Sequence, residues 1–381
     1  MRKMRPITEE KMAEITAFME EKKIDLLFLA DWENSRDVNL RFLSGHPMDG
    51  FLLLTPGGET ILIPWDVELA KEHATVDTII TDPDSRTNFE QYVKEVLKSD
   101  SPVIGVNAMI SYRWIIALKK ALPALRIYDN PIEVNELFRK LRSTKTPKEL
   151  AFLEKAGKIG NKVLKDIEKF AKEVPNGTEN DLSFLVMKKI REYGAEDNSF
   201  PSLVANVERS HLIHCHPFAG NNQFSKPGLA LIDFGALYQG YASDITVPIS
   251  FGKLTAEQEK IKQTCFAAYE AAIDAIDIGV PLWKISQAAV DVIEKAGFHM
   301  PHGLGHGLGL TVHDAPGVRQ KPTSEEKLKD FVELKVEEGM VFTIEPGVYV
   351  KGAGGQRLEN DVMIKNGKVV VYTKSKPLEV E

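Results

Sequence analysis

The sequence lacks several features that would place the protein in a specialised class. Its 381 residues include only two cysteines, Cys215 and Cys265, too few for a disulfide framework or a thiolate zinc site. No segment approaches the roughly 18 consecutive apolar residues of a membrane span, and the N-terminus has no apolar core of a signal peptide. We therefore expect a cytoplasmic protein with no membrane association, in which any metal ion is held by oxygen and imidazole ligands.

A basic excess is also missing. The formal net charge is -7 at pH 7, and a protein that binds the phosphate backbone of a nucleic acid would carry a basic patch or an arginine-rich run. We therefore expect no nucleic-acid partner. Hydrophobic residues make up 43% of the chain and charged residues 27%, which is typical of a globular protein. The length exceeds what one hydrophobic core usually supports, so two domains are expected.

The first domain is expected to cover residues 1–133. An amphipathic pattern predicts a helix over 9–23. Short apolar runs predict strands of a small α/β domain, and they lie at 25–30, 51–55, 60–64 and 102–106. Residues 134–381 are expected to form the second domain, in which Thr146, Pro147 and Glu149 have the spacing of a helix N-cap, first-turn proline and capping-box partner.

The second domain shows a faint internal repeat. Helical patterns at 147–173 and before 196 precede a strand-rich stretch at 228–249. Helical patterns that open at Thr255 and end near 298 precede a second such stretch at 339–372. Both stretches have the alternation and glycine-rich turns of hairpins. The pattern predicts an α+β fold with pseudo-twofold symmetry, in which helices lie outside a curved antiparallel sheet.

Four carboxylates stand inside these apolar stretches. Asp233 and Asp244 belong to the first, and Glu345 and Glu359 to the second. A turn near Tyr238 and Gln239 would set the two aspartates opposite one another on paired strands. Burying a lone carboxylate costs several kcal/mol. Any one of the four could instead serve a turn, a bulge or an ion pair with Arg357, but the four together favour a site for two divalent cations.

A histidine cluster lies between the two hairpins. The stretch HGLGHGLGLTVHD at 302–314 holds three histidines and four glycines. Two divalent cations would balance four carboxylates, with one neutral imidazole completing the site. Oxygen-rich ligation with one histidine points to Mn or Co, with Zn or Fe also possible. A zincin motif is excluded, because Gly303 stands where HExxH requires glutamate and the glycines oppose a helix.

In the settings IDFGALYQGYASDIT, HGLGHGLGL, TIEPGVY and RLEND, these residues resemble the five-ligand site of the pita-bread metallopeptidases, in particular prolidases (Xaa-Pro dipeptidases) and aminopeptidase P. The first 130 or so residues, with NLRFLSG and FLLLTPGG, resemble the creatinase-type N-terminal domain of that family. The resemblance implies a pita-bread catalytic domain and two divalent metal ions. Its implied ligands are Asp233, Asp244, His306, Glu345 and Glu359, with Asp244 and Glu359 bridging both ions.

The resemblance also implies roles around the metal ions. A metal-bridging hydroxide would attack the peptide bond that precedes proline in a short peptide, with Glu345 as the proton shuttle. His313 would steady the tetrahedral intermediate, and His302 would face the substrate. His216, which stands seventeen residues before Asp233, would also face the substrate. Arg357 would lie behind the bridging glutamate as a further substrate-side residue. A homodimer is also implied.

Peptide length and the exact reaction stay open. Prolidases commonly have an arginine after the His-Glu-x-Pro stretch, which can hold a dipeptide's carboxylate. This chain reads HDAPGVR, with Gly317 at that position and Arg319 two residues later. Aminopeptidase P is therefore an alternative. A creatinase-like hydrolase or lyase, or a non-catalytic peptide-binding module, would be expected to have lost ligands, and here all five are present. The native metal and the residue preferred before proline are not determined.

Overall fold

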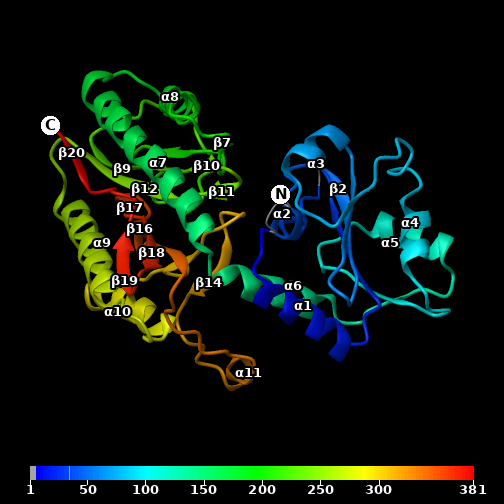
Figure 1. The fold of residues 1–381 in the computed structure, drawn as a ribbon. Coiled ribbons are helices and arrows are strands. Elements are labelled where there is room, and N and C mark those ends of the chain that lie inside the picture. The colour runs from blue at the N-terminus through cyan, green and yellow to red at the C-terminus, as the bar shows by residue number, and fades with distance from the viewer. Residues whose placement is uncertain (1–5, 34) are drawn as a thin grey trace. The chain divides into compact units, whose positions relative to one another are not determined.

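The structure is a computed structural model that describes residues 6–33 and 35–381. The first five residues, which belong to the N-terminus for which no signal peptide is expected, lie outside this range. The chain divides into two compact units, residues 1–141 and 142–381 (Figure 1). In the part of the chain that is described, no helix has both the length and the apolar character needed to cross a membrane.

The N-terminal unit is built on a six-stranded mixed sheet with the order β4-β3-β2-β1-β5-β6. Its strands are β1 (Leu26–Asp31), β2 (Gly50–Leu54), β3 (Thr60–Pro64), β4 (Thr78–Ile79), β5 (Val103–Gly105) and β6 (Arg126–Ile127). Its helices are α1 (Glu9–Glu21), α2 (Val38–Ser44), α3 (Val67–His73), α4 (Phe89–Val96), α5 (Tyr112–Ala121) and α6 (Pro131–Ser143). Every residue of β1, β2 and β3 is buried, which explains why these strands read as continuous apolar runs. The expected α/β domain is thus observed.

The two units meet within α6 rather than before it. The sequence places the domain boundary after residue 133, whereas the compact units divide between Leu141 and Arg142. Polar side chains of α6 explain the difference, because they bind residues of the first unit. Glu133 forms an ion pair with Lys22 (3.2 Å), and Lys140 forms one with Glu14 (2.9 Å). Most of this helix therefore belongs to the N-terminal unit.

The C-terminal unit begins with the predicted capped helix. Its helices are α7 (Pro147–Glu173), α8 (Glu179–Glu192), α9 (Ala256–Asp274), α10 (Leu282–Lys295) and α11 (Glu325–Lys329). Thr146 forms the expected capping box with Glu149, and Thr255 forms one with Gln258 at the start of α9. In each box two of the backbone N–H groups left unpaired at the helix start gain a partner. The two caps fix where each helix pair begins.

The strands of this unit form two principal sheets and two small ones. The principal sheets have the orders β20-β12-β9-β8 and β14-β13-β15-β18-β19, and the small ones β11-β10-β7 and β16-β17. The strands are β7 (Asp197–Asn198), β8 (Leu203–Ala205), β9 (Gly228–Phe234), β10 (Ala236–Tyr238), β11 (Tyr241–Ala242), β12 (Ile245–Phe251), β13 (Gly305–Gly307), β14 (Asp314–Val318), β15 (Val341–Ile344), β16 (Gly347–Val350), β17 (Gly354–Arg357), β18 (Asn360–Lys365), β19 (Lys368–Val371) and β20 (Leu378–Val380). The single antiparallel sheet that we expected is therefore divided, and β20 joins β12 in parallel.

The repeat appears in the packing of the core. One apolar cluster joins residues of α7 and α8 to β9 and β12. A second joins residues of α9 and α10 to β15 and β18. Each half thus buries one helix pair against its own sheet, as a two-layer arrangement requires. The α+β fold with two related halves is confirmed.

The turn of the first hairpin differs from the predicted one by one residue. Gln239 and Gly240 form the turn, with φ of 51° and 81°. Asp233 therefore pairs with Thr246, and Asp244 lies two residues before that partner. The prediction that the aspartates stand directly opposite is wrong, because a shift of one turn residue moves the register by two. The two carboxylates are diagonal neighbours instead.

Candidate metal centre

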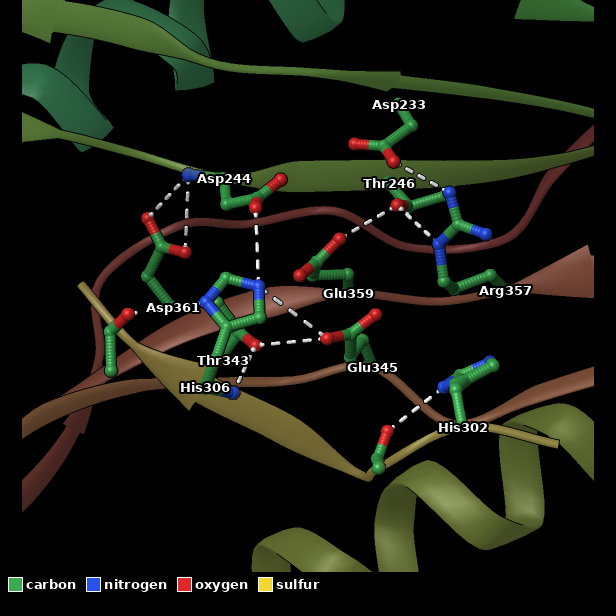
Figure 2. A network of polar contacts seen from close by, with 12 residues as sticks. Asp233, Asp244, Thr246, His302, His306, Thr343, Glu345, Arg357, Glu359 and Asp361 are labelled. Carbon is green, nitrogen blue, oxygen red and sulfur yellow. Dashed lines mark hydrogen bonds and ion pairs between the residues drawn. The ribbon is translucent and has the colours of Figure 1, made fainter. Parts of the chain in front are cut away.

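Three predicted ligands from separate strands converge in the C-terminal unit. Asp244 precedes β12, His306 is the central residue of β13, and Glu359 precedes β18. One ligand atom from each lies within 4.8 Å of the other two (Figure 2). Such a group of oxygen and imidazole donors is the geometry of a site for a divalent cation.

The other two predicted ligands lie in the same polar network. The Nε2 atom of His306 is 3.5 Å from Oε1 of Glu345 and 3.5 Å from Oδ2 of Asp244 (Figure 2). Asp233 ends the apolar part of β9, and its Oδ2 accepts a hydrogen bond from Arg357 at 2.5 Å. The register of β15 with β18 pairs Ile344 with Asn360, which sets Glu345 opposite Glu359 at the next position.

The hydrogen bonding of His306 engages Nδ1 and leaves Nε2 available as a metal ligand. Its Nδ1 lies 3.1 Å from the carbonyl oxygen of Gly307. Because a carbonyl only accepts, Nδ1 carries the proton, and the lone pair of Nε2 points to the carboxylates. Burial lowers the pKa of His306 to about 4, with a further contribution from His313. The ring is therefore neutral at pH 7, as a metal ligand must be.

The carboxylates repel one another strongly when no cation is present. Burial raises the pKa values of Asp244 and Glu359 well above their usual range, and neighbouring carboxylates raise them further. Burial and the charge of Asp233 raise the pKa of Glu345 to about 8, against the opposing charge of Arg357. A cluster that ionises so reluctantly is stabilised by bound positive charge.

Unpaired oxygens show that the cluster fits metal ions. Among residues 6–33 and 35–381, the buried atoms Oδ1 of Asp233, Oδ1 of Asp244 and Oε1 of Glu359 have no hydrogen-bond partner. A buried oxygen without a partner is costly, and native structures leave few of them. Each of these three atoms belongs to a predicted ligand. The donor set, rich in oxygen with one imidazole, suits divalent first-row ions.

Arg357 holds the ligands rather than facing outward. It is 2% exposed, and besides Asp233 its Nε donates to Oγ1 of Thr246 at 3.0 Å. The Thr246 hydroxyl in turn donates to Oε2 of Glu359 at 2.7 Å (Figure 2). Arg357 thus orients one ligand directly and another through a hydroxyl, a supporting contact of the kind that fixes metal ligands.

His302 is also held by protein groups on both nitrogens. Its Nδ1 donates to the carbonyl of Gly303 at 2.8 Å, and its Nε2 lies 3.0 Å from the hydroxyl of Tyr349. That hydroxyl accepts from Arg357 at 2.9 Å, so its proton is available to His302. Burial lowers the pKa of His302 to about 4. The imidazole is therefore neutral and linked to the arginine behind the ligands.

His313 lies over the metal ligand. Its ring centroid is 4.3 Å from that of His306, and the residue is exposed on its other side. The strand after it is anchored by Asp314, whose carboxylate binds Arg142 with a shortest distance of 3.0 Å. Burial raises the pKa of Asp314, but Arg142 and Lys145 lower it more, so the net shift is downward. The ion pair fixes the backbone next to His313.

Two histidines of the loop between β8 and β9, His214 and His216, are candidates for the predicted substrate-side role. His216 is exposed, and the structure records no contact of its ring with the predicted ligands within the described residues. Burial is the main cause that lowers the pKa values of His302 and His313, and His214, which is also exposed, adds a smaller effect on both.

Three further residues at the site escaped the sequence reading. Thr343 accepts a hydrogen bond from the backbone N–H of His306 at 3.2 Å. Asp361, fully buried, accepts the N–H of Asp244 at 3.2 Å, and Tyr349 joins His302 to Arg357. Asp361 could have been found, since it is a second acid in the apolar RLEND segment. The hydroxyl residues give no comparable signal in a strand.

The glycines around His306 serve strand packing. A Cβ atom on Gly305 would lie 2.0 Å from the carbonyl oxygen of Thr343, and one on Gly307 would lie 2.1 Å from Ala315. Both contacts are far below any tolerable separation. The glycines therefore let β13 fit closely between β15 and β14. This close packing fixes the position of His306 relative to the carboxylates.

Fold and site together define a metallohydrolase with a creatinase-like N-terminal unit. Residues 151–366 match the Metallopeptidase family M24, and residues 11–144 match the Creatinase/Prolidase N-terminal domain. The chain is 31% identical to the Xaa-Pro dipeptidase of Pyrococcus horikoshii over 95% of this chain and 96% of that one. It is 29% identical to the Xaa-Pro dipeptidase of Pyrococcus furiosus over 96% and 98%.

A solved structure supports the same family assignment. The prolidase from Pyrococcus horikoshii OT3 superimposes with a TM-score of 0.81 at 28% identity, covering 97% of this chain and 99% of that one. The chain therefore belongs to metallopeptidase family M24 and is a metallopeptidase. Its substrates are peptides, and its family implies bound divalent metal ions.

Proposed function

We propose that the protein is a dinuclear metal-dependent Xaa-Pro dipeptidase, which cleaves the bond before proline in short peptides. The observation that carries the proposal is the group of Asp244, His306 and Glu359, in a cluster that leaves three buried carboxylate oxygens unpaired. Asp233, Asp244, His306, Glu345 and Glu359 would hold two ions, Mn or Co in preference to Zn or Fe. The names of the two Pyrococcus relatives support the Xaa-Pro specificity.

The chemistry that two divalent ions supply at such a site is a water molecule acidified enough to attack a peptide carbonyl as hydroxide at neutral pH. The protein's own groups would manage the proton and the oxyanion. Glu345, whose Oε1 lies 3.5 Å from Nε2 of His306, would accept a proton and return it to the leaving imino nitrogen. His313, exposed beside His306, is placed to stabilise the developing negative charge.

A histidine of the 206–223 loop would complete the substrate side. The family resemblance assigns this role to His216 by spacing, while the hydrogen bond from Arg357 to the carbonyl of Ile213 (3.5 Å) favours the adjacent His214. Single alanine variants distinguish the two assignments. The residue that contacts substrate should lose kcat/KM when replaced, and the other should retain it.

One observation favours a second candidate, an Xaa-Pro aminopeptidase that acts on longer peptides. Gly317 provides no side chain where prolidases commonly have arginine. The side chain of Arg319 instead packs beside Gly317 and Gly303, with its Nε 3.5 Å from the Cβ position of Gly317. Burial is the main cause that lowers the pKa values of His306 and His313, and the charge of Arg319 lowers both slightly further. A cation so placed could hold the substrate's carboxylate at a different depth, and so change the preferred length.

The test compares hydrolysis of Ala-Pro and Met-Pro with that of Arg-Pro-Pro, with Mn²⁺ or Co²⁺ and after chelation. A dipeptidase cleaves the dipeptides faster, and an aminopeptidase P cleaves the tripeptide faster. Metal analysis of the purified protein should find two ions per chain. Cleavage that chelators leave unchanged would contradict the proposal, and so would the absence of cleavage before proline in every metal-loaded form.

We further expect a cytoplasmic homodimer, as the family resemblance implies. Sedimentation velocity measures the assembly state directly. A species of one chain at micromolar concentration would contradict the dimer without affecting the proposed chemistry.

A further inference from the structure

The loop at 206–223, between β8 and β9, is fastened at both ends by one buried acid. Glu179 is the first residue of α8, and its side chain is 0% exposed. Its Oε1 accepts the backbone N–H of Asn206 at 3.0 Å, and its Oε2 accepts that of Gly220 at 2.9 Å. A single carboxylate thus ties the start of the loop to its end.

Arg209 completes this fastening from within the loop. Its NH1 atom forms an ion pair with Oε2 of Glu179, and its NH2 atom donates to the carbonyl of Pro217. The guanidinium therefore joins the acid to the far side of the loop, directly after His216. Charge-assisted hydrogen bonds in a buried setting are the strong and directional ones. We call these two residues the loop clamp.

The middle of the same loop touches the metal centre. The carbonyl of Ile213 accepts a hydrogen bond from Arg357 at 3.5 Å. Ser210 accepts the N–H of Gly355, in the strand that ends at Arg357, at 2.9 Å. Cys215 lies in this part of the loop, and burial raises the pKa of its thiol. The charges of Arg209 and Arg357 lower this pKa, and the charge of Glu179 raises it. The loop centre therefore lies between the clamp and Arg357.

We propose that Glu179 and Arg209 are positioning residues, which set the 206–223 loop so that His214 faces the substrate side of the metal centre. The inference rests on the proposed function. Neither residue is a predicted ligand, and neither belongs to the motifs on which the family resemblance depends. Misplacing an imidazole by about 1 Å can lower a rate on the order of a hundredfold, so the clamp governs turnover through His214.

A double-mutant cycle tests this link. Arg209→Lys keeps the charge but loses the two-armed contact. In otherwise unaltered metal-loaded enzyme, we expect it to lower kcat/KM for Ala-Pro by about tenfold or more, with unchanged metal content. In the His214→Ala background, the same change should lower kcat/KM less than about twofold, because coupled residues are not additive. An equal loss in both backgrounds would overturn the proposal.

Matched controls separate positioning from general damage. Arg191→Lys removes the same kind of contact at the other end of α8, where Arg191 binds Asp197, and should leave kcat/KM unchanged. If Arg209→Lys fails to fold, Glu179→Gln gives a second variant, with Glu192→Gln on α8 as its control. An effect of Arg191→Lys as large as that of Arg209→Lys would also overturn the proposal.

A second measurement does not depend on activity. The nine histidines allow ring resonances to be assigned from single variants in zinc-loaded, diamagnetic protein. Arg209→Lys should move the ring resonance of His214 and leave that of exposed His299 in place, and an unmoved His214 would overturn the inference. Wild-type protein that cleaves no Xaa-Pro peptide would refute the proposed function, while this spectrum would still decide the role of the clamp.

Discussion

At the scale of single residues, the three imidazoles of the 302–314 stretch differ in what holds them. His306 gives one nitrogen to a backbone carbonyl and keeps the other for the carboxylates. His302 has protein partners on both nitrogens, and His313 is exposed above His306. Hydrogen bonding to the second nitrogen therefore distinguishes the proposed ligand, His306, from the other two histidines.

Replacing these histidines should separate metal binding from turnover. His306→Ala removes a ligand and should abolish metal loading, since metal sites depend on a complete donor set. His313→Ala should keep both ions and lower kcat by about 10² to 10³, as the loss of an oxyanion donor does. Metal content by atomic spectroscopy and kcat on Ala-Pro check both. Loss of metal from the His313 variant alone would reverse the assignment.

The cation at position 319 should determine the peptide length. If Arg319 binds the substrate's carboxylate, Arg319→Ala should raise KM by about ten- to a hundredfold for the peptide length that the enzyme prefers, because hydrogen bonds to charged groups contribute about 1.5 to 3 kcal/mol. kcat should change little. The control is Lys321→Ala, a nearby cation whose ammonium lies over Trp283 and Phe331. Equal effects of the two changes would refute a specific role for Arg319.

At the scale of elements, the ligands stand at strand ends and turns. Asp233 is near the end of β9, Asp244 directly precedes β12, and Glu345 directly follows β15. Asp244 and Glu345 thus lie just outside their strands, whereas Asp233 lies within its sheet, paired with Leu203 and Thr246, and Arg357 balances its charge. The glycines of β13 allow this strand to pack closely against β14 and β15. The position of His306 depends on this packing.

A methyl group on this strand should therefore be damaging. Gly307→Ala would place a Cβ 2.1 Å from Ala315, and overpacking of this kind costs about 1 to 3 kcal/mol, occasionally more. We expect a lower melting temperature and weaker metal binding. Gly317→Ala in adjacent β14 is the matched control, because the nearest atom to its Cβ position is 3.5 Å away in the flexible side chain of Arg319. Similar melting temperatures for the two variants would contradict the packing argument.

At the scale of the whole molecule, the acidic cluster links stability to both metal and pH. In metal-free protein the pKa values of Asp244, Glu345 and Glu359 are raised. The folded state then keeps protons that the unfolded state releases above about pH 4. This contribution to stability is complete below the unfolded pKa and is lost as pH rises through the folded pKa, which is about 8 for Glu345.

The histidines limit the pH window of this effect. His302 and His306 have pKa values lowered to about 4, so they increase stability as pH rises up to the ordinary histidine pKa of about 6.5. Above that pH, of these groups only the acids still make the stability of the folded state depend on pH. We therefore expect the melting temperature of chelator-treated protein to fall between about pH 6.5 and 8.

Metal loading should remove this fall. Bound ions keep the carboxylates ionised and stabilise the folded state by mass action. Scanning calorimetry of matched samples with EDTA or Mn²⁺ at several pH values checks the prediction. The buried pair of Arg142 and Asp314 does not interfere, because the pKa of Asp314 is lowered and its contribution is lost only in acid. A melting temperature of the metal-free protein that rises over this window would contradict the argument.

Much of the fold follows from local patterns. The runs at 25–30, 51–55 and 60–64 became buried strands, and the cap at Thr146 started α7 as expected. The domain boundary and the register of the first hairpin were predicted less well from the sequence. The turn at Gln239 and Gly240 depends on which residues adopt positive φ, and the prediction placed it one residue too early although Gly240 adopts positive φ without steric cost.

The sequence by itself determined the two-domain α+β organisation and the identity of five candidate ligands, because acids in apolar strands and glycine-flanked histidines are visible without coordinates. Only the tertiary structure decided that Arg357 braces Asp233 and Thr246, that His302 has no free nitrogen, and that Asp361 supports Asp244. These contacts join residues far apart in the chain, often through hydroxyl or backbone groups. Their spacing in sequence carries no period, so only the packing of the sheets brings them together.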